Sequence, residues 1–321
     1  MPEMMKTREG FGRGLADLGR ENPDVVVLVG DLTDSTMVSF FAQEFPDRFI
    51  EMGVAEQNMM NAAAGLSLVG KIPYLATYGA FATCRCADQI RVTVCYSDLN
   101  VKIGGAHGGI SVGPDGATHQ ALEEISMMRS LPNMKVIVPC DFYETRKATV
   151  ASADIWGPFY IRFGRENVPV VTDENTPFEF GKGLTMRAGG DVAIVACGVM
   201  VYEALVAADE LAGEGIDARV INMHTIKPID EPLLAQAAAE CGAIVTAEEH
   251  QVNGGLGGAV AEVVVRRHPV PMEFVAVLDR FGQSGKPDEL MTKFGLKAPN
   301  IVQAVRRVLK RKSAGVYSES K

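Results

Sequence analysis

The sequence has no long apolar run, no leader-like start and no excess of positive charge. No segment approaches eighteen consecutive apolar residues, and the first six residues lack the apolar core of a signal peptide. We therefore expect a cytoplasmic protein without membrane contact. The 40 acidic residues outnumber the 31 Lys and Arg, and the resulting net charge of −9 argues against a nucleic-acid-binding surface.

Paired cysteine motifs are also absent, although the chain contains six cysteines. They are Cys84, Cys86, Cys95, Cys140, Cys197 and Cys241. None shows the Cys-x-x-Cys spacing that is typical of structural zinc sites, so we expect no metal site built by this chain alone. Most lie inside apolar strand-like or helical segments. We expect them to be reduced, buried small hydrophobes.

The chain is long enough for two domains with cores of their own, with 321 residues of which 47% are hydrophobic and 22% charged. Apolar runs bounded by Gly, Pro or Asp predict strands that alternate with helical stretches. In the first half these runs cover residues 24–30, 72–76, 99–104 and 134–139. Strands that are apolar on both faces and alternate with helices indicate a parallel α/β sheet.

A second α/β set follows a loop-like segment rich in Pro and Gly. Its predicted strands cover residues 191–196, 218–222, 243–247 and 274–277, and its predicted helices cover 202–212 and 231–240. The pattern predicts two doubly wound α/β domains, at residues 1–168 and 188–321, joined by a linker at 169–187. We expect the polar segment after Lys310 to fray.

The glycine-rich turn at residues 253–258 precedes an apolar helix and has two interpretations. Backbone N–H groups at a helix start attract phosphate. However, the turn has neither the spacing of a dinucleotide site nor a Walker lysine, so we favour a tight turn that packs a helix against its sheet. His224 and His268 have no partner pattern, and His250, which follows two glutamates, is only a weak site candidate.

Three stretches of the first half carry candidate site residues. The first, Gly53-Val-Ala-Glu56, places one carboxylate at the opening turn of a helix that is otherwise small and apolar. Taken alone, this glutamate is an ordinary helix-start charge. The second stretch, residues 77–91, carries Tyr78 and Phe81, which alone would be core aromatics. The third, residues 107–120, carries two histidines and the sequence Asp-Gly-Ala-Thr-His-Gln.

Together these stretches resemble the pyrimidine-binding half of transketolase, and the resemblance spans nearly the whole chain. It implies that Glu56 hydrogen-bonds the aminopyrimidine ring nitrogen of thiamine diphosphate and favours the imino tautomer that deprotonates the thiazolium carbon. The cofactor then carries out the carbanion chemistry. The resemblance gives Phe81, with Tyr78 nearby, the role of stacking on the aminopyrimidine. Asp31 matches a cofactor-side acidic residue at the end of the first strand, where α/β ligand sites gather.

The same resemblance implies a site for a phosphorylated sugar. The family positions that surround the sugar phosphate are matched by Arg8, Ser35, His107 and Arg165. Cationic and imidazole donors with a hydroxyl suit a dianionic phosphate. Asp115 and His119 match the pair that reads substrate hydroxyls and assists proton transfer near the reacting carbonyl, a task for which a neutral imidazole is suited near pH 7. The resemblance thus makes Glu56, His107 and His119 the expected catalytic residues.

The chain also departs from the family pattern. The departures at Pro114, Ala117, Cys84 and Cys86 leave the exact sugar open. A larger departure is the absence of the Gly-Asp-Gly motif and its later Asn, which bind diphosphate and magnesium in the family. The chain therefore looks like the C-terminal half of a split transketolase. We expect an N-terminal partner subunit that binds most of the Mg²⁺ (or Ca²⁺), an α2β2-type assembly, and two-carbon ketol transfer between phosphorylated sugars, as in pentose phosphate metabolism.

Three alternatives are kept beside this interpretation. The β subunit of a 2-oxo acid dehydrogenase first component and a 1-deoxyxylulose-5-phosphate synthase-like enzyme share the fold and the Glu56 chemistry. The Asp-Gly-x-Thr-His-Gln sequence argues against the first, and His107, where an acidic residue is usual, argues against the second. The third alternative is a catalytically silent scaffold subunit. A silent subunit needs only packing residues, so the joint presence of the candidate residues argues against it.

Overall fold

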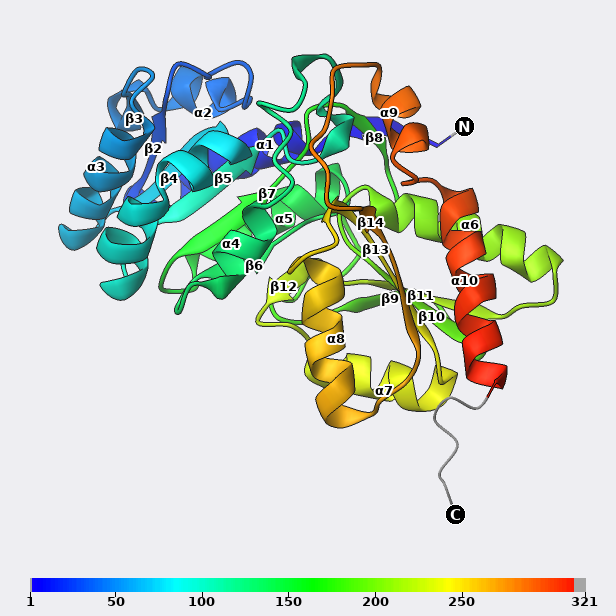
Figure 1. The fold of residues 1–321 in the computed structure, drawn as a ribbon. Helices are drawn as coiled ribbons and strands as arrows, with labels where there is room; N and C mark the ends of the chain where they lie inside the picture. Colours follow the sequence, from blue (N-terminus) through cyan, green and yellow to red (C-terminus); the bar gives the residue numbers. More distant parts are fainter. Residues whose placement is uncertain (1, 315–321) are drawn as a thin grey trace.

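Two mainly parallel β-sheets lie side by side, each covered by helices on both faces, in a computed structural model that describes residues 2–314 (Figure 1). The first sheet has seven strands in the order β12 (Thr225–Lys227), β6 (Lys135–Ile137), β7 (Phe159–Arg162), β5 (Lys102–Ala106), β4 (Ile72–Tyr78), β2 (Val25–Val29) and β3 (Phe49–Glu51). The strand β12 is antiparallel to β6, whereas the other pairs are parallel. The predicted parallel α/β sheet is therefore confirmed.

Side-chain alternation along β2 shows how helices cover both faces of this sheet. Val27 packs in a cluster with Phe11 and Leu15 of α1 (Thr7–Glu21), while Leu28 packs with Met59 of α3 (Glu56–Leu68). Successive side chains of a strand point to opposite faces, so a run of Val and Leu is buried on both sides. The remaining helical segments of this half are α2 (Ser39–Glu44), η1 (Pro46–Arg48), η2 (Phe81–Arg85), η3 (Gln89–Tyr96), η4 (Ile110–Asp115), α4 (Glu124–Ser130) and α5 (Phe142–Ala153).

The second sheet has five strands in the order β14 (Met272–Val277), β13 (Ile244–Gln251), β10 (Val192–Ala196), β11 (Ala218–Asn222) and β9 (Leu184–Arg187). The strand β9 is antiparallel, and the other pairs are parallel. The covering helices are α6 (Met200–Gly213), α7 (Glu231–Cys241), α8 (Leu256–Arg267), α9 (Pro287–Lys293) and α10 (Ala298–Ser313). Asp230 begins α7 by accepting the Leu233 amide, and Gly242, with a φ of 62°, ends it.

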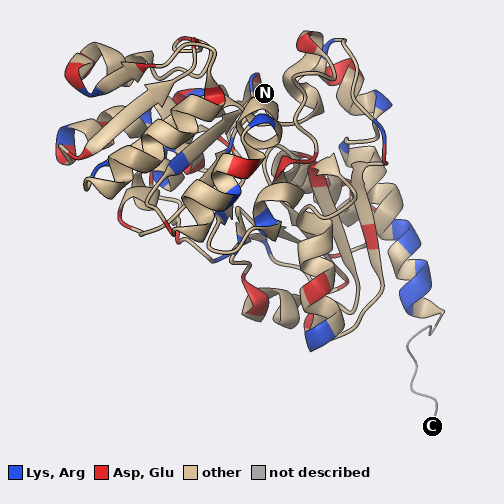
Figure 2. Cartoon of the chain, turned by 60° about the vertical axis from the view of Figure 1, so that its left-hand side comes forward, with Lys and Arg blue, Asp and Glu red and all other residues tan. Residues whose placement is uncertain are grey.

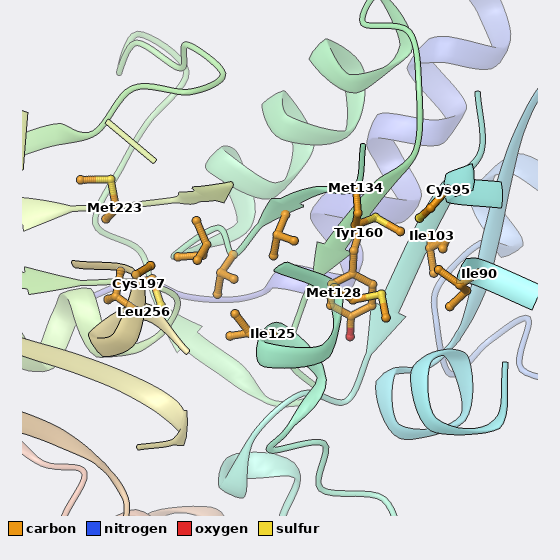
Figure 3. Close-up of a cluster of buried hydrophobic side chains, with 14 of the residues drawn as sticks. Ile90, Cys95, Ile103, Ile125, Met128, Met134, Tyr160, Cys197, Met223 and Leu256 are labelled. Carbon is orange, nitrogen blue, oxygen red and sulfur yellow. The ribbon is translucent and has the colours of Figure 1, made fainter. Parts of the chain in front are cut away.

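One apolar core runs through both halves. Met134 and Tyr160 of the first half share a cluster of buried side chains with Cys197, Met223 and Leu256 of the second (Figure 3). A short two-stranded sheet, formed by β1 (Met4–Lys6) and β8 (Asn167–Pro169), joins the start of the chain to the end of the first half. The two halves are therefore packed as one body.

Three sequence-based expectations need correction. Residues 184–187, which we assigned to the linker, form β9 because they pair with β11. The chain does not fray directly after Lys310, since α10 continues to Ser313 and Lys312 donates to the carbonyls of Asp191 and Cys241. The basic last turn of α10 is visible as blue segments near the C-terminus in Figure 2. Residues 315–321 lie outside the described part of the chain.

The third correction concerns the cysteines. All six are free, as expected, but Cys84 is exposed whereas the other five are buried. Cys84 lies in the π-helical segment η2, on the side that faces away from the core. A separate result concerns membranes: within residues 2–314, no helix is both long enough and apolar enough to cross a bilayer.

Candidate functional site

The candidate residues gather at the carboxyl edge of the first sheet. Tyr78 ends β4, His107 follows β5, and Arg165 lies just beyond β7. These strands are parallel and adjacent, so their carboxyl ends meet at one edge, which is where ligand sites of α/β sheets form. The strands β3 and β4, which follow β2 in the sequence, pair with opposite edges of β2. The strand order therefore reverses between β2 and β4, and this topological switch point lies beside Tyr78 at the end of β4.

Four aromatic and imidazole rings form a cluster at this edge. The centroid of the Tyr78 ring lies 4.0 Å from that of His107, 5.7 Å from that of Phe81 and 5.6 Å from that of His119. The Phe81 and His119 centroids are 5.2 Å apart. These residues are up to 41 positions apart in the sequence, and the fold brings them together.

Glu56 reaches this cluster through an arginine that the sequence analysis did not single out. Glu56 begins α3 and is 3% exposed. Its Oε1 accepts a hydrogen bond of 2.8 Å from Arg85, whose guanidinium carbon lies 4.4 Å from the centroid of the Phe81 ring. Arg85 therefore contacts both the carboxylate and the ring. The available signal was its position four residues after Phe81 in a helical segment, a spacing that places two side chains on one face.

Two guanidinium groups concentrate positive charge beside the rings. Arg8 donates to the carbonyl of Ser35 at 2.9 Å, and Arg165 donates to the carbonyl of Val112 at 3.0 Å. Burial and the charge of Arg165 lower the pKa of Arg8, which indicates that the two cations lie close enough to repel. The Nε of Arg8 is buried and has no partner among the described residues. The arrangement favours a bound anion.

His107 is buried in an unusual backbone conformation next to these cations. It is 2% exposed, has a φ of 58°, and its Nδ1 has no partner among the described residues. Burial, aided by the charges of Arg8, Arg165 and His119, lowers the pKa of His107 to about 3. The imidazole is therefore neutral near pH 7, and its Nδ1 is free to bond a ligand.

The remaining candidate residues lie at different distances from the ring cluster and the two arginines. Asp115 lies 3.8 Å from Arg165, and the Nδ1 of His119 lies 2.9 Å from the Thr118 hydroxyl. Ser35 contributes its carbonyl rather than its hydroxyl to the contact with Arg8. Asp31, after β2, is exposed, and its amide donates to Glu51 at 2.7 Å. No hydrogen bond or ion pair among residues 2–314 joins Asp31 to the ring cluster.

The residues fit one end of thiamine diphosphate. A buried carboxyl and two stackable rings suit an aromatic ring that carries nitrogen donors and acceptors. The diphosphate end is different: residues 2–314 contain no group of three or more His, Cys, Asp or Glu side chains that could hold a metal ion. The described residues therefore suit the pyrimidine end of the cofactor.

The glycine-rich turn before α8 is structural, as the sequence analysis favoured. Glu248 accepts the amides of Leu256 and Gly257 at 2.7 and 2.8 Å, so the chain supplies its own anion at this helix start. His250 is also structural, because it is fully buried and its Nδ1 lies 2.8 Å from the carbonyl of Gln251. A cavity of about 790 Å³ between α1 and α5 contains none of the candidate residues, and its charges pair with one another, as in Arg146–Asp17 at 2.6 Å.

Comparison with known proteins identifies the class of this fold and site. The family model described as "Transketolase, pyrimidine binding domain" matches residues 3–171, and the model described as "Transketolase, C-terminal domain" matches residues 181–301. The chain therefore belongs to the transketolase family, and its order of domains is that of the C-terminal part of a transketolase. The family assignment and fold class expected from the sequence are confirmed.

Three relatives illustrate the similarity. The chain is 44% identical to the 6-deoxy-6-sulfo-D-fructose transketolase subunit of Clostridium sp., covering 93% of each chain. It is 42% identical to a putative transketolase C-terminal section of Methanocaldococcus jannaschii, covering 95% of this chain and 96% of that one. A solved structure described as a split gene transketolase, inactive beta4 tetramer, is 50% identical with a TM-score of 0.91, covering 96% of this chain and 99% of that one.

Proposed function

We propose that this chain is the C-terminal subunit of a cytoplasmic two-subunit transketolase that moves a two-carbon ketol unit between phosphorylated sugars. The observation that carries the proposal is the buried Glu56 carboxyl, which Arg85 links to the Phe81 ring of the cluster at the carboxyl edge of the sheet. Thiamine diphosphate, when bound there, supplies the carbanion chemistry of ketol transfer. The family is thiamine-diphosphate dependent, which supports this assignment.

Each candidate residue has a task in this proposal. Glu56 holds a proton at a pyrimidine ring nitrogen, a task for which a carboxyl shielded from water is suited. Phe81 and Tyr78 orient the ring by stacking. His107, which is neutral near pH 7, and His119 hold or accept protons near the reacting carbonyl, with His107 acting through its free Nδ1. Asp31 on the cofactor side and Asp115 on the sugar hydroxyls are part of the same proposal.

The sugar's anionic group is held by Arg8, Ser35, His107 and Arg165. Both guanidinium groups are charge-assisted donors, and the Nε of Arg8 has no partner among the described residues, so this pair suits a substrate with a terminal anionic group. The Clostridium relative is named for a sulfonated sugar. Comparing a phosphorylated acceptor with its sulfonated counterpart therefore tests the sugar: a clear preference for the phosphate is expected, and a preference for the sulfonate would redirect the proposal to sulfosugars.

The chain acts with a partner in this proposal. The N-terminal subunit supplies the diphosphate and Mg²⁺ (or Ca²⁺) site, and the two chains form an α2β2-type assembly. The inactive β4 tetramer named for the 50% identical relative supports this dependence. The isolated chain should bind thiamine diphosphate poorly and show no turnover, because an uncompensated polyanion gains little from this half of the site. Turnover by this chain alone would contradict the two-subunit assignment.

The decisive test is Glu56→Gln in the assembled complex. The amide keeps the size of the side chain but cannot share its proton, so we expect turnover to fall by about 10²-fold or more while assembly and cofactor binding persist. Proton exchange at the C2 carbon of bound thiamine diphosphate, followed by NMR, measures the relevant chemistry directly. Glu231→Gln is the matched control, because Glu231 also begins a helix. Equal exchange in the Glu56→Gln and unmodified complexes would reduce Glu56 to a helix-start charge.

A further inference from the structure

The loop at residues 107–120, which carries His107, Asp115 and His119, rests on the second half of the chain. Glu249 lies near the end of β13 and is 4% exposed. Its carboxylate reaches out of its own sheet and accepts a hydrogen bond from the amide of Ser111. On a second side of the loop, Gln120 donates from one nitrogen to the carbonyls of Ile110 and Gln283, both at 3.0 Å.

The backbone next to His107 lies directly on this support. Gly109 has a φ of 96°, and a Cβ placed on it would be 2.2 Å from the carboxyl carbon of Glu249. A Cβ on Gly108 would be 2.5 Å from the Nε of Arg162, and the Nη2 of the same side chain donates to the carbonyl of Glu249 at 2.7 Å. Only glycine permits so close an approach in this conformation. The backbone segment that follows His107 therefore packs directly against the buried side chains of Arg162 and Glu249.

We propose that Glu249 is a positioning residue, which fixes the substrate loop through the Ser111 amide and so sets the placement of His107 for ketol transfer. The inference rests on the proposed function and gives a task to the C-terminal domain, none of whose residues were assigned to the site. A hydrogen bond from a backbone amide to a buried carboxylate is strong and directional. It holds the loop at its middle, between His107 on one side and Asp115 on the other.

Glu248, the preceding residue, is a matched control. It lies on the same strand and is 1% exposed, and its carboxylate likewise accepts backbone amides, those of Leu256 and Gly257. Both of these amides belong to the second half of the chain. Loss of either glutamate removes a buried carboxylate, but only loss of Glu249 releases the substrate loop.

Amide hydrogen–deuterium exchange on the free chain tests the support without any catalysis. We expect Glu249→Gln to speed exchange over residues 108–113 by about tenfold and to leave residues 253–262 unchanged, since a neutral amide is the weaker acceptor. Glu248→Gln should do the reverse. Unchanged exchange over residues 108–113 in Glu249→Gln would overturn the proposal, and so would equal loosening there by both variants.

Kinetics of the assembled complex test the consequence. We expect the acceptor KM to rise three- to tenfold in Glu249→Gln and more than tenfold in Glu249→Ala, with Glu248→Gln within twofold of the unmodified complex. A merely structural role predicts instead that KM follows the loss of thermal stability in every variant. A loosened loop with unchanged KM and kcat would also refute the positioning role. If the unmodified complex shows no ketol transfer, the proposed function fails separately, while the exchange measurement still decides whether Glu249 orders the loop.

Discussion

The neutral, buried His107 predicts a specific loss of stability in acid. In the folded chain its pKa is lowered to about 3, from an ordinary value of 6.5, first by burial and then by the nearby cations. Between these two values the unfolded chain binds a proton that the folded chain does not bind. Unfolding is therefore increasingly favoured as the pH falls from about 6.5 toward about 3, and the contribution is absent above pH 6.5.

The size of this stability loss depends on how far the pH lies below 6.5, the ordinary pKa of histidine. At pH 4.5 the difference in proton binding amounts to about 3 kcal/mol of unfolding free energy, since each pH unit corresponds to about 1.4 kcal/mol. His107→Asn removes the titration and tolerates the positive φ, because Asn is among the residues that most readily adopt it. The unmodified chain should thus lose about 3 kcal/mol more of its unfolding free energy than the variant does between pH 7.5 and pH 4.5.

Urea denaturation of both chains at several pH values measures this difference. Comparing pH slopes cancels the packing change of the substitution, and His224, whose pKa burial lowers to about 4, contributes equally to both chains. NMR of the His107 C2 proton gives an independent reading and should show no titration between pH 8 and pH 5. Equal pH slopes for the two chains, or a His107 midpoint near pH 6.5, would refute the reasoning.

Two further predictions follow from single side chains. Arg165→Ala in the assembled complex should raise the KM for a phosphorylated acceptor roughly ten- to a hundredfold with little effect on cofactor binding, since a charge-assisted contact is worth about 1.5–3 kcal/mol. Steady-state kinetics measures this change, with Arg187→Ala as the control. An unchanged KM would remove Arg165 from the anion site. Asp141→Asn should lower the unfolding free energy by about 3 kcal/mol. The buried carboxylate accepts from the amides of Glu144, Val171 and Thr172 and from the Thr172 hydroxyl, and a side-chain amide cannot satisfy all of these donors. Urea denaturation should show this loss, and it should show little change for Asp154→Asn at an exposed position.

Local patterns were sufficient for much of the fold. The apolar runs at residues 24–30 and 191–196 predicted β2 and β10, because a strand buried on both faces must be apolar throughout. The strand β7 was missed because it includes Arg162, whose burial depends on Glu124. The strand β5 was placed too early because Lys102 is buried within it, held by the carbonyls of Ile155 and Gly157. Partners distant in the sequence decide both cases.

In the candidate site, too, residues within sequence motifs could be identified in advance, whereas residues that act through distant partners could not. Residues within matching motifs, such as Phe81, His107 and His119, are brought together by the fold. Arg85 and Glu249 carry no motif of their own, and their importance depends on contacts with Glu56 and Ser111 that only the folded chain creates. Charged side chains that act through distant partners leave no periodic signal in a single sequence.

The strand β12 affects how this protein can be made. Residues 225–227 belong by sequence to the second half, yet they pair with β6 and close the edge of the first sheet. During synthesis the first half emerges from the ribosome well before this strand, and an unpaired sheet edge is a template for association with other chains. Expression of residues 1–180 alone would leave that edge permanently open. Attempts to exchange the two halves between relatives should therefore carry β12 together with the first half.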